Sequence, residues 1–251
     1  MTHEPDVLAK VRKILAKAED PAATPEEAET YTAKAAELMA AYGIDRALLA
    51  ESMPDSDVVG DRVVVLDAPY ALDKAALLSS VAFELRCRAV RRIRYVGPRA
   101  TKEVSIHLFG YDSDLVRVEI LFTSLLLQAQ TSLARTDPPP WESLAAYRRS
   151  WLAGFTAAVA RRLRDAEERA RDAAEEGRAG TAAPTGRSVE LVLVDRDRTV
   201  AAAVESEYPR LATARSRQLS GSGRRSGWHA GQRADLGGSR VGRRRRGELA
   251  G

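Results

Sequence analysis

The stretch RCRAVRRIRYVGPRATKEVSIHLFGYDSDLVRVEILFTSLLLQAQTSLART, residues 86–136, decides the fold because its apolar period changes along its length. Up to Gly110 the apolar residues alternate, which predicts a β-hairpin with one buried face. That face carries Cys87, Ala89, Ile93 and Tyr95 on the first strand and Val104, Ile106 and Leu108 on the second. From Tyr111 onward the apolar residues follow a helical period nearly all round, so we expect this helix at the centre of the core.

The segments that follow predict a second long helix and then a smaller strand and helix. The run DPPPW at 137–141 ends the central helix, and the next helix is expected over 142–176. Its apolar stripe fades beyond Leu163, which indicates a solvated extension with favourable charge pairs. We then expect a flexible linker over 177–188, a buried strand over 189–194 (VELVLV) and a helix over 198–208 capped by Asp195 or Asp197.

The first fifty residues predict a pair of helices. Residues 5–20 form an amphipathic, cationic segment with a helical period. The second helix begins with a capping box, in which Thr24 is the N-cap and Glu27 is the third helical residue. We expect Gly43 to end this helix and Asp45 to cap a short third helix over residues 46–52.

Together these segments predict an α+β fold with an N-terminal helical hairpin, a small mixed sheet packed by long helices, and a disordered basic C-terminal tail. The expected regions are a helical hairpin domain at 1–52, a linker with a short strand at 53–69, an α+β domain at 70–208 and a Gly/Arg-rich tail at 209–251.

The net charge of +4 is unevenly distributed along the chain. Residues 214–251 contain ten arginines and two acids, which is a net charge of +8 and leaves −4 for residues 1–213. A basic end on an acidic body is typical of proteins with an electrostatic partner, such as nucleic acid or an anionic surface, and also of solubilising tails.

Cysteine content and apolar run lengths indicate the cellular setting. Cys87 is the only cysteine, so the chain can form neither an intramolecular disulfide nor a Cys-based zinc site. The N-terminus lacks the apolar region of a secretory signal, and no apolar run approaches the 18 residues of a membrane span. We therefore expect a cytoplasmic protein with no membrane partner.

The N-terminal hairpin has a specific pattern. Residues 10–45, KVRKILAKAEDPAATPEEAETYTAKAAELMAAYGID, combine a basic first helix and an acid-proline turn with EAE, ELM and YGID in the second helix. This pattern resembles the family called domain of unknown function 2786 (DUF2786), which is found in bacteria and their phages. Residues 70–176 resemble the region that accompanies the hairpin in actinobacterial members. The resemblance implies no established activity, cofactor or catalytic residue.

The histidines give little support for catalysis. His3, His107 and His229 show no metal-ligand spacing. His107 alternates to the face opposite Ile106 and Leu108, and we interpret it as a strand-surface residue with no indicated partner.

Asp112 and Asp114 form the best acidic pair. With Glu84 or Glu119 they could hold the divalent cation of a metal-dependent hydrolase or nuclease. Their position at a helix start favours a capping role instead. We therefore expect no metal and no cofactor, and leave open whether the protein is an enzyme.

Three glycines in the tail, Gly223, Gly227 and Gly231, lie four residues apart in SGSGRRSGWHAGQRADLGG, residues 220–238. A phosphate loop is not supported, because no strand precedes the glycines and no Walker lysine follows them. The spacing leaves a flexible arm or a segment whose backbone approaches another closely, and the intervening arginines favour the arm.

Three basic groups agree in sign and favour a nucleic-acid partner. The first helix is cationic, the hairpin presents Arg88, Arg92 and Arg94 on one face, and the tail ends with Arg243, Arg244, Arg245 and Arg246. Arginine clusters bind phosphates through counterion release, and Tyr95 or Trp228 could stack on exposed bases. We therefore hypothesise a non-catalytic protein associated with DNA or RNA.

Two alternatives remain open. One is the metal-dependent hydrolase with Asp112 and Asp114, and the other is an adaptor whose Ala-rich helical face at 26–42 packs on a partner protein or a second copy.

Overall fold

A computed structural model describes residues 4–18, 25–98, 100–179, 187–212 and 217–234. The helices are α1 (Glu4–Ala18), α2 (Pro25–Ser52), α3 (Ala71–Glu84), α4 (Asp112–Ala134), α5 (Leu144–Ala179), α6 (Val189–Glu207) and α7 (Arg224–Arg233), with a 3₁₀ turn η1 at Pro54–Ser56. The strands are β1 (Val59–Leu66), β2 (Arg88–Val96) and β3 (Thr101–Tyr111).

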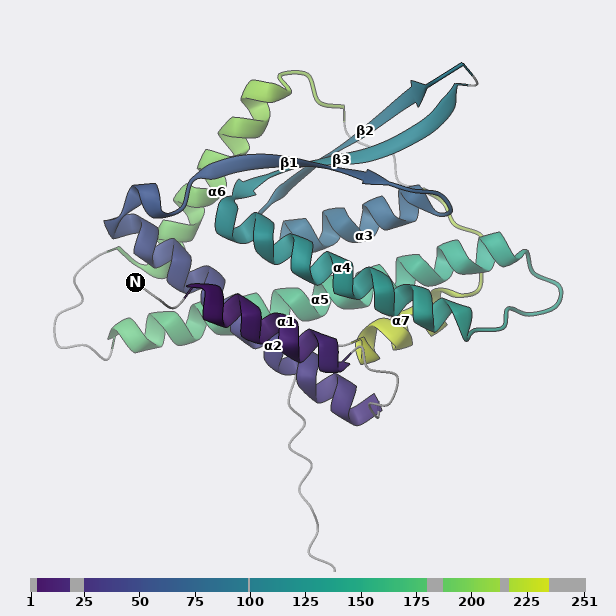
Figure 1. The fold of residues 1–251 in the computed structure, drawn as a ribbon, viewed down its shortest axis with the longest axis horizontal. Helices are drawn as coiled ribbons and strands as arrows, with labels where there is room; N and C mark the ends of the chain where they lie inside the picture. Colours follow the sequence, from purple (N-terminus) through teal and green to yellow (C-terminus); the bar gives the residue numbers. More distant parts are fainter. Residues whose placement is uncertain (1–3, 19–24, 99, 180–186, 213–216, 235–251) are drawn as a thin grey trace, which may run out of the picture.

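The three strands form one antiparallel sheet in the order β1-β3-β2, so the expected hairpin is confirmed as β2 and β3. The sheet lies over α3 and α4, and α5 runs beneath these helices with the α1–α2 pair beside it (Figure 1). The α+β class is confirmed.

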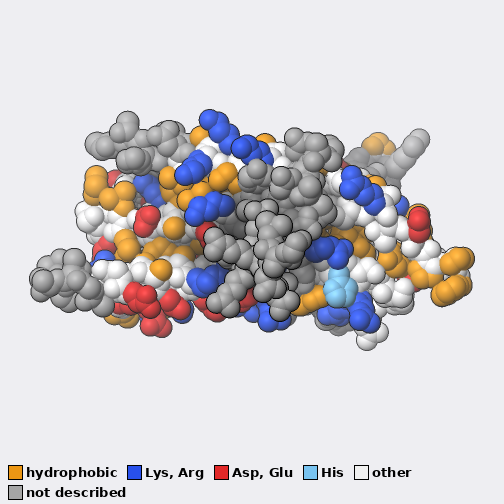
Figure 2. Space-filling view, turned by 90° about the horizontal axis from the view of Figure 1, so that it is seen from below, with side chains coloured by type: hydrophobic (Ala, Val, Ile, Leu, Met, Phe, Trp, Pro, Cys, Tyr) orange, Lys and Arg blue, Asp and Glu red, His pale blue; other side chains and the backbone are white. Residues whose placement is uncertain are grey.

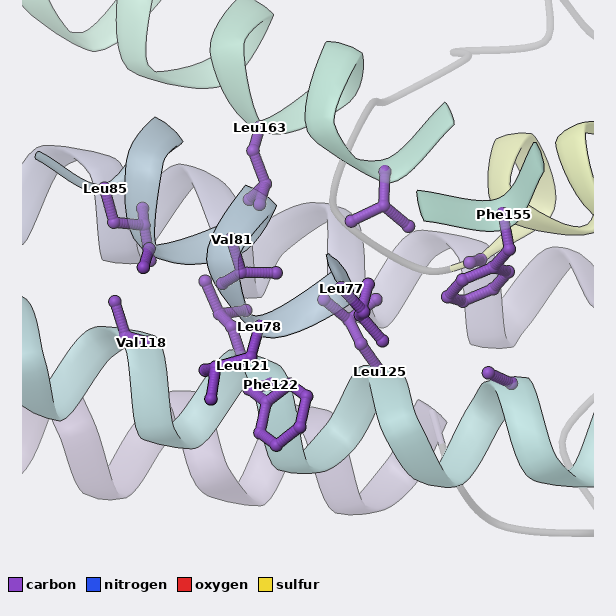
Figure 3. Packing of buried hydrophobic residues seen from close by; sticks show 14 of the residues in the cluster. Leu77, Leu78, Val81, Leu85, Val118, Leu121, Phe122, Leu125, Phe155 and Leu163 are labelled. Atoms are coloured by element: carbon purple, nitrogen blue, oxygen red, sulfur yellow. The ribbon is translucent and has the colours of Figure 1, made fainter. Parts of the chain in front are cut away.

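The main core lies between the sheet and the long helices. Figure 3 shows Leu77, Leu78 and Val81 from α3, Val118, Leu121 and Leu125 from α4, and Phe155 and Leu163 from α5. Leu115, Val118 and Leu121 are at most 1% exposed, which confirms that α4 is central. Val104, Ile106 and Leu108 of β3 cover this core from the sheet, as their alternation predicts.

The strand predicted over residues 189–194 is wrong, because this run forms the first turns of α6. The Ser188 hydroxyl caps the helix by accepting a hydrogen bond from the Leu191 amide at 3.3 Å. Val192 and Leu193 are buried against Ile44 and Ala47 of α2, which gives the run a helical burial pattern. Asp195 and Asp197 therefore lie inside α6 and do not cap it.

Gly43 does not end the second helix, and the separate helix expected after Asp45 is part of α2. A Cβ atom at Gly43 would collide with the guanidinium group of Arg117, so glycine is needed here for close packing. The N-cap predicted at Thr24 lies outside the described residues.

The C-terminal part of α5 is more than the solvated extension expected beyond Leu163. Ala166 and Glu167 are buried, and Ala170 and Ala174 pack against the cluster formed by α2 and α6. The carboxylate of Glu175 accepts a hydrogen bond from the Val189 amide at 2.8 Å. This part of α5 supports α6. The small side chains of its alanines allow α5 to pack closely on the neighbouring helices.

The flexible arm predicted around the tail glycines is wrong for residues 224–233, which form α7. Gly227 and Gly231 are buried, and a Cβ atom at either position would collide with the main chain of Trp151 or Phe155 in α5. The four-residue spacing therefore marks a helix whose backbone lies directly on α5, the other possibility that the sequence left open.

Candidate nucleic-acid interface

The predicted phosphate-binding arginines of the hairpin share one face of β2, and that face is only partly available. Arg88 is committed to an ion pair with Asp197 of α6, with 3.2 Å between Nη2 and Oδ2. Arg94 lies opposite Glu103 in the strand pairing, so an acid stands next to it on the same face. Arg92 lies opposite the neutral Ser105.

The other face of the hairpin end carries a different set of exposed side chains. Arg91, Ile93 and Tyr95 alternate along β2, and Lys102 lies opposite Tyr95 on β3. Tyr95 is 70% exposed, and within the described ranges neither Arg91 nor Lys102 forms an ion pair. The hairpin end projects beyond the helices in Figure 1, which leaves this face open. We call Arg91, Ile93, Tyr95 and Lys102 the hairpin platform.

A pocket of about 210 Å³ opens next to this platform, between α3, β2, α5 and the segment that begins at residue 217. Its lining consists of Asp73, Ala76, Arg91, Ala153, Thr156, Arg217 and Leu219. The Nη1 atom of Arg217 donates a hydrogen bond to Oδ1 of Asp73 at 2.9 Å.

Sequence reasoning missed Arg91 and Arg217. Arg91 lies between Ala89 and Ile93 on the face that the alternation predicts to be buried, and this break in the apolar pattern is the signal that could have identified it. Arg217 reaches the pocket only through the fold, so no local pattern indicates it.

The tail contains the remaining predicted arginines and, in α7, three arginines that were not predicted as site residues. Arg243, Arg244, Arg245 and Arg246 lie outside the described part of the chain. In α7, Arg224, Arg225 and Arg233 are exposed because the glycine face is turned to α5. Figure 2 shows several groups of basic side chains on the part of the lower face that the described residues make visible.

Asp112 and Asp114 lie in different surroundings, so the structure does not support treating them as an acidic pair that holds a cation. Asp114 is 1% exposed and accepts hydrogen bonds from Arg117 at 2.7 Å and from Arg196 at 3.2 Å. Asp112 is exposed. In the described ranges no group of three His, Cys, Asp or Glu side chains is arranged to hold a metal ion.

The capping role expected for the α4 aspartates belongs to another residue. Oδ1 of Asp57 accepts a hydrogen bond from the Ser113 amide at 3.0 Å, and its Oδ2 accepts one from the Ser113 hydroxyl at 2.7 Å. The start of α4 is therefore capped by a carboxylate from the segment before β1.

Asp57 and Asp114 belong to a buried network of three acids and three arginines. Glu167, Arg86, Arg117 and Arg196 complete it, and Arg117 bridges Asp114 and Glu167. Burial alone would lower the pKa of Arg117, but Glu167 and Asp114 raise it above its usual value, so the guanidinium stays charged. The guanidinium of Arg196 lies 3.4 Å from the centre of the Tyr111 ring.

His107 is not the strand-surface residue that we expected. Its side chain is 8% exposed, Nε2 lies 2.7 Å from Oδ2 of Asp61, and Nδ1 lies 2.7 Å from the hydroxyl of Tyr208. The ring also packs on Phe109, with centroids 4.3 Å apart. These contacts of His107, which is itself buried, tie the end of α6 to the outer face of the sheet.

Cys87 is buried against Gly110 at the start of β2. Burial, and secondarily the negative charge of Asp114, raise the pKa of the thiol far above its usual value. The thiol therefore stays protonated and unreactive at neutral pH.

Two other pockets carry more acids than bases. One of about 280 Å³ lies between α1, α2 and the start of α4 and is lined by Asp55, Asp57, Asp112 and a single arginine, Arg46. The other, of about 270 Å³, has five acids and three arginines in its lining. Neither fits a polyanion as well as the pocket beside Arg91 does.

The fold and these surfaces define an α+β protein in which a basic hairpin projects from the helices and α7 packs on α5, the longest helix. In the comparison with protein families, residues 6–46, which cover most of α1 and α2, match the family described as "Protein of unknown function (DUF2786)". The resemblance of this segment is therefore confirmed. No curated protein and no solved structure matches the chain.

None of the helices in the described part of the chain combines the length and apolar content that a membrane span requires.

Proposed function

We propose that this protein binds nucleic acid without catalysis and that the hairpin platform is its primary contact. The observation that carries this proposal is the placement of Arg91, Tyr95 and Lys102 on one exposed face, where no acid of the described residues forms an ion pair with Arg91 or Lys102.

The chemistry of the platform suits a single strand. Aromatic side chains stack on unpaired bases, and nearby Arg and Lys side chains follow the phosphates. Tyr95 offers most of its ring to solvent, and Lys102 lies directly across the strand pair from it. Arg92 and Arg94 on the opposite face add positive potential, whereas the ion pair of Arg88 with Asp197 weakens its contribution.

The two alternatives receive less support from the described contacts. The Ala-rich face of α2 is occupied within the molecule, because Ala35, Ala36 and Met39 are buried in the main core. The carboxylate of Asp114 is occupied by two arginines, which makes it a poor ligand for a metal ion.

The test is a salt-titrated binding assay with single-stranded DNA, duplex DNA and RNA oligonucleotides on the full chain. We expect Tyr95→Ala to weaken single-strand binding by about tenfold, because base stacking on an aromatic contributes 1–3 kcal/mol per base. Lys102→Ala should reduce the slope of log K against log salt by about 0.7, the value for one lost phosphate contact on a single strand.

The matched control is Trp141→Ala, which removes another exposed aromatic, 86% exposed in the segment between α4 and α5. Phe83 is unsuitable because its ring lies 5.7 Å from the guanidinium of Arg88. Equal effects of Tyr95→Ala and Trp141→Ala, or binding that does not change with salt, would contradict the proposal.

A further inference from the structure

The pocket beside Arg91 brings together polar groups that are distant in the sequence. Arg91 comes from β2, Thr156 from α5 and Arg217 from the segment before α7. Ala76 and Ala153 have small side chains, so they leave the hollow open, and Leu219 adds an apolar wall.

Each polar group has donors available to a ligand. Arg91 has no ion-pair partner in the described ranges. Arg217 is held by Asp73, which is 5% exposed, and its guanidinium keeps further N–H groups beyond the one that it donates. Thr156 is only 9% exposed, and its hydroxyl has no hydrogen-bond partner among the described residues.

The charges of the lining favour an anion. Arg217 balances Asp73, so Arg91 is left as an excess positive charge. Guanidinium groups match the geometry of phosphate oxygens and can donate two parallel hydrogen bonds to them. The Thr156 hydroxyl, which has no hydrogen-bond partner among the described residues, can donate a third hydrogen bond.

The size of the pocket restricts the ligand to a small group. Its volume of about 210 Å³ is below the 300–1,000 Å³ typical of pockets for larger ligands. From Arg91 the platform leads away along β2 to Tyr95, about 13 Å at the strand rise of 3.3 Å per residue. A phosphate in the pocket would therefore leave the neighbouring nucleotides on the platform.

We propose that this pocket binds a phosphate monoester on a compact organic group, with Arg91, Arg217 and Thr156 as its donors. The monoester is the 5′-terminal phosphate of a single strand, which rests on the proposed function, or that of a free mononucleotide, which does not. Asp73 is a positioning residue that orients Arg217.

The first experiment compares a single-stranded oligonucleotide that carries a 5′-phosphate with the same strand ending in a 5′-hydroxyl. We expect the full chain to bind the phosphorylated strand about tenfold more tightly, in line with charge-assisted hydrogen bonds to a dianion. Arg91→Ala and Arg217→Ala should abolish this preference.

Arg94→Ala is the matched control, because it removes one arginine from the same hairpin on the opposite face. It should weaken both strands equally and leave the preference intact. Equal binding of the two strands by the unmodified chain, or a preference that survives Arg91→Ala, would overturn the proposal for strand ends.

Two further variants separate the pocket from general charge effects. Ala153→Leu fills the hollow without changing the net charge, and Thr156→Val removes only the hydroxyl. Both should reduce the preference for the 5′-phosphate. Thermal unfolding checks that each variant is folded. If Ala153→Leu does not fold, Thr156→Val, which nearly conserves the shape of the side chain, still tests the pocket.

The second experiment titrates the chain with AMP, adenosine and inorganic phosphate by calorimetry. AMP binding that is at least tenfold weaker in Arg91→Ala, with no binding of adenosine, supports the pocket even if no oligonucleotide binds and the proposed function fails. Oligonucleotide binding without a 5′-phosphate preference, together with no AMP or phosphate binding, refutes the pocket and leaves the proposed function standing.

Discussion

Nη2 of Arg196 lies 2.7 Å from Oδ2 of Asp57, although the two residues are 139 positions apart in the chain. Asp57 also caps α4 through Ser113, so one buried carboxylate joins the start of α4 to the middle of α6. This pair is one of the contacts that hold α6 in place, together with the packing of Val200 and Val204 on the sheet.

Removing Arg196 should therefore destabilise the whole fold. Arg196→Ala leaves Asp57 and Asp114 buried with less positive charge near them, and breaking a buried ion pair from one side typically costs 3–5 kcal/mol. We expect a loss of about that size in the free energy of unfolding, measured by urea titration. Arg198→Ala, which removes an exposed arginine from the same helix, should leave the unfolding midpoint nearly unchanged; similar losses in both variants would show that the buried network is not the cause.

Replacement of Gly227 by alanine should separate α7 from α5. The new methyl group would overlap the main chain of Trp151, and overpacking of this kind costs about 1–3 kcal/mol. Amide hydrogen exchange in α7 should become faster. Gly177→Ala is the control, because no heavy atom lies within 4 Å of the added Cβ at that helical position. It should be neutral or stabilise α5 by up to about 1 kcal/mol, and equal effects of the two substitutions would contradict the packing argument.

Tyr208→Phe should loosen the end of α6. The substitution removes the hydroxyl that lies 2.7 Å from Nδ1 of His107 and leaves that buried ring nitrogen without its partner. We expect a loss of about 1–3 kcal/mol in the free energy of unfolding, from chemical denaturation. Tyr95→Phe removes a hydroxyl from an exposed ring and should have no effect on stability. Unchanged stability in Tyr208→Phe would mean that water replaces the hydroxyl.

Cys87 should resist alkylation in the folded protein. Burial holds its thiol protonated, and the thiolate is the reactive form. At pH 8 we expect a thiol reagent to modify Cys87 only after the chain is unfolded in denaturant, where the pKa returns to its ordinary range. Fast modification without denaturant, followed by absorbance or mass spectrometry, would show that the start of β2 opens readily.

Elements with a complete apolar period could be predicted from the sequence. Apart from Arg91 in β2, the hairpin and α4 follow the strand and helix periods, so local pattern and tertiary packing agree. Residues 189–194 could not be assigned in the same way, since a short apolar run fits either a strand or a buried helix. Its partners, Ile44 and Ala47, lie far away in the sequence.

For a similar reason, the sequence predicted only part of the candidate site. The alternation placed Arg88, Arg92 and Arg94 on one face of β2. It could not show that Arg88 lies near an acid of α6 or that Arg94 lies near an acid of β3. The pocket depends on Arg217, whose position is set by Asp73 of α3. Pairings between distant segments are decided by the packed core, which a single sequence does not reveal.

In α7, the residues that pack on α5 are different from the residues that form the exposed surface of the helix. The glycine backbone of α7 and the side chains of Ala230 and Ala234 make this contact, so the outward side chains of Arg224, Arg225 and Arg233 are not part of it. A mutation that reverses the charge of that surface therefore needs no compensating change in the contact between α7 and α5.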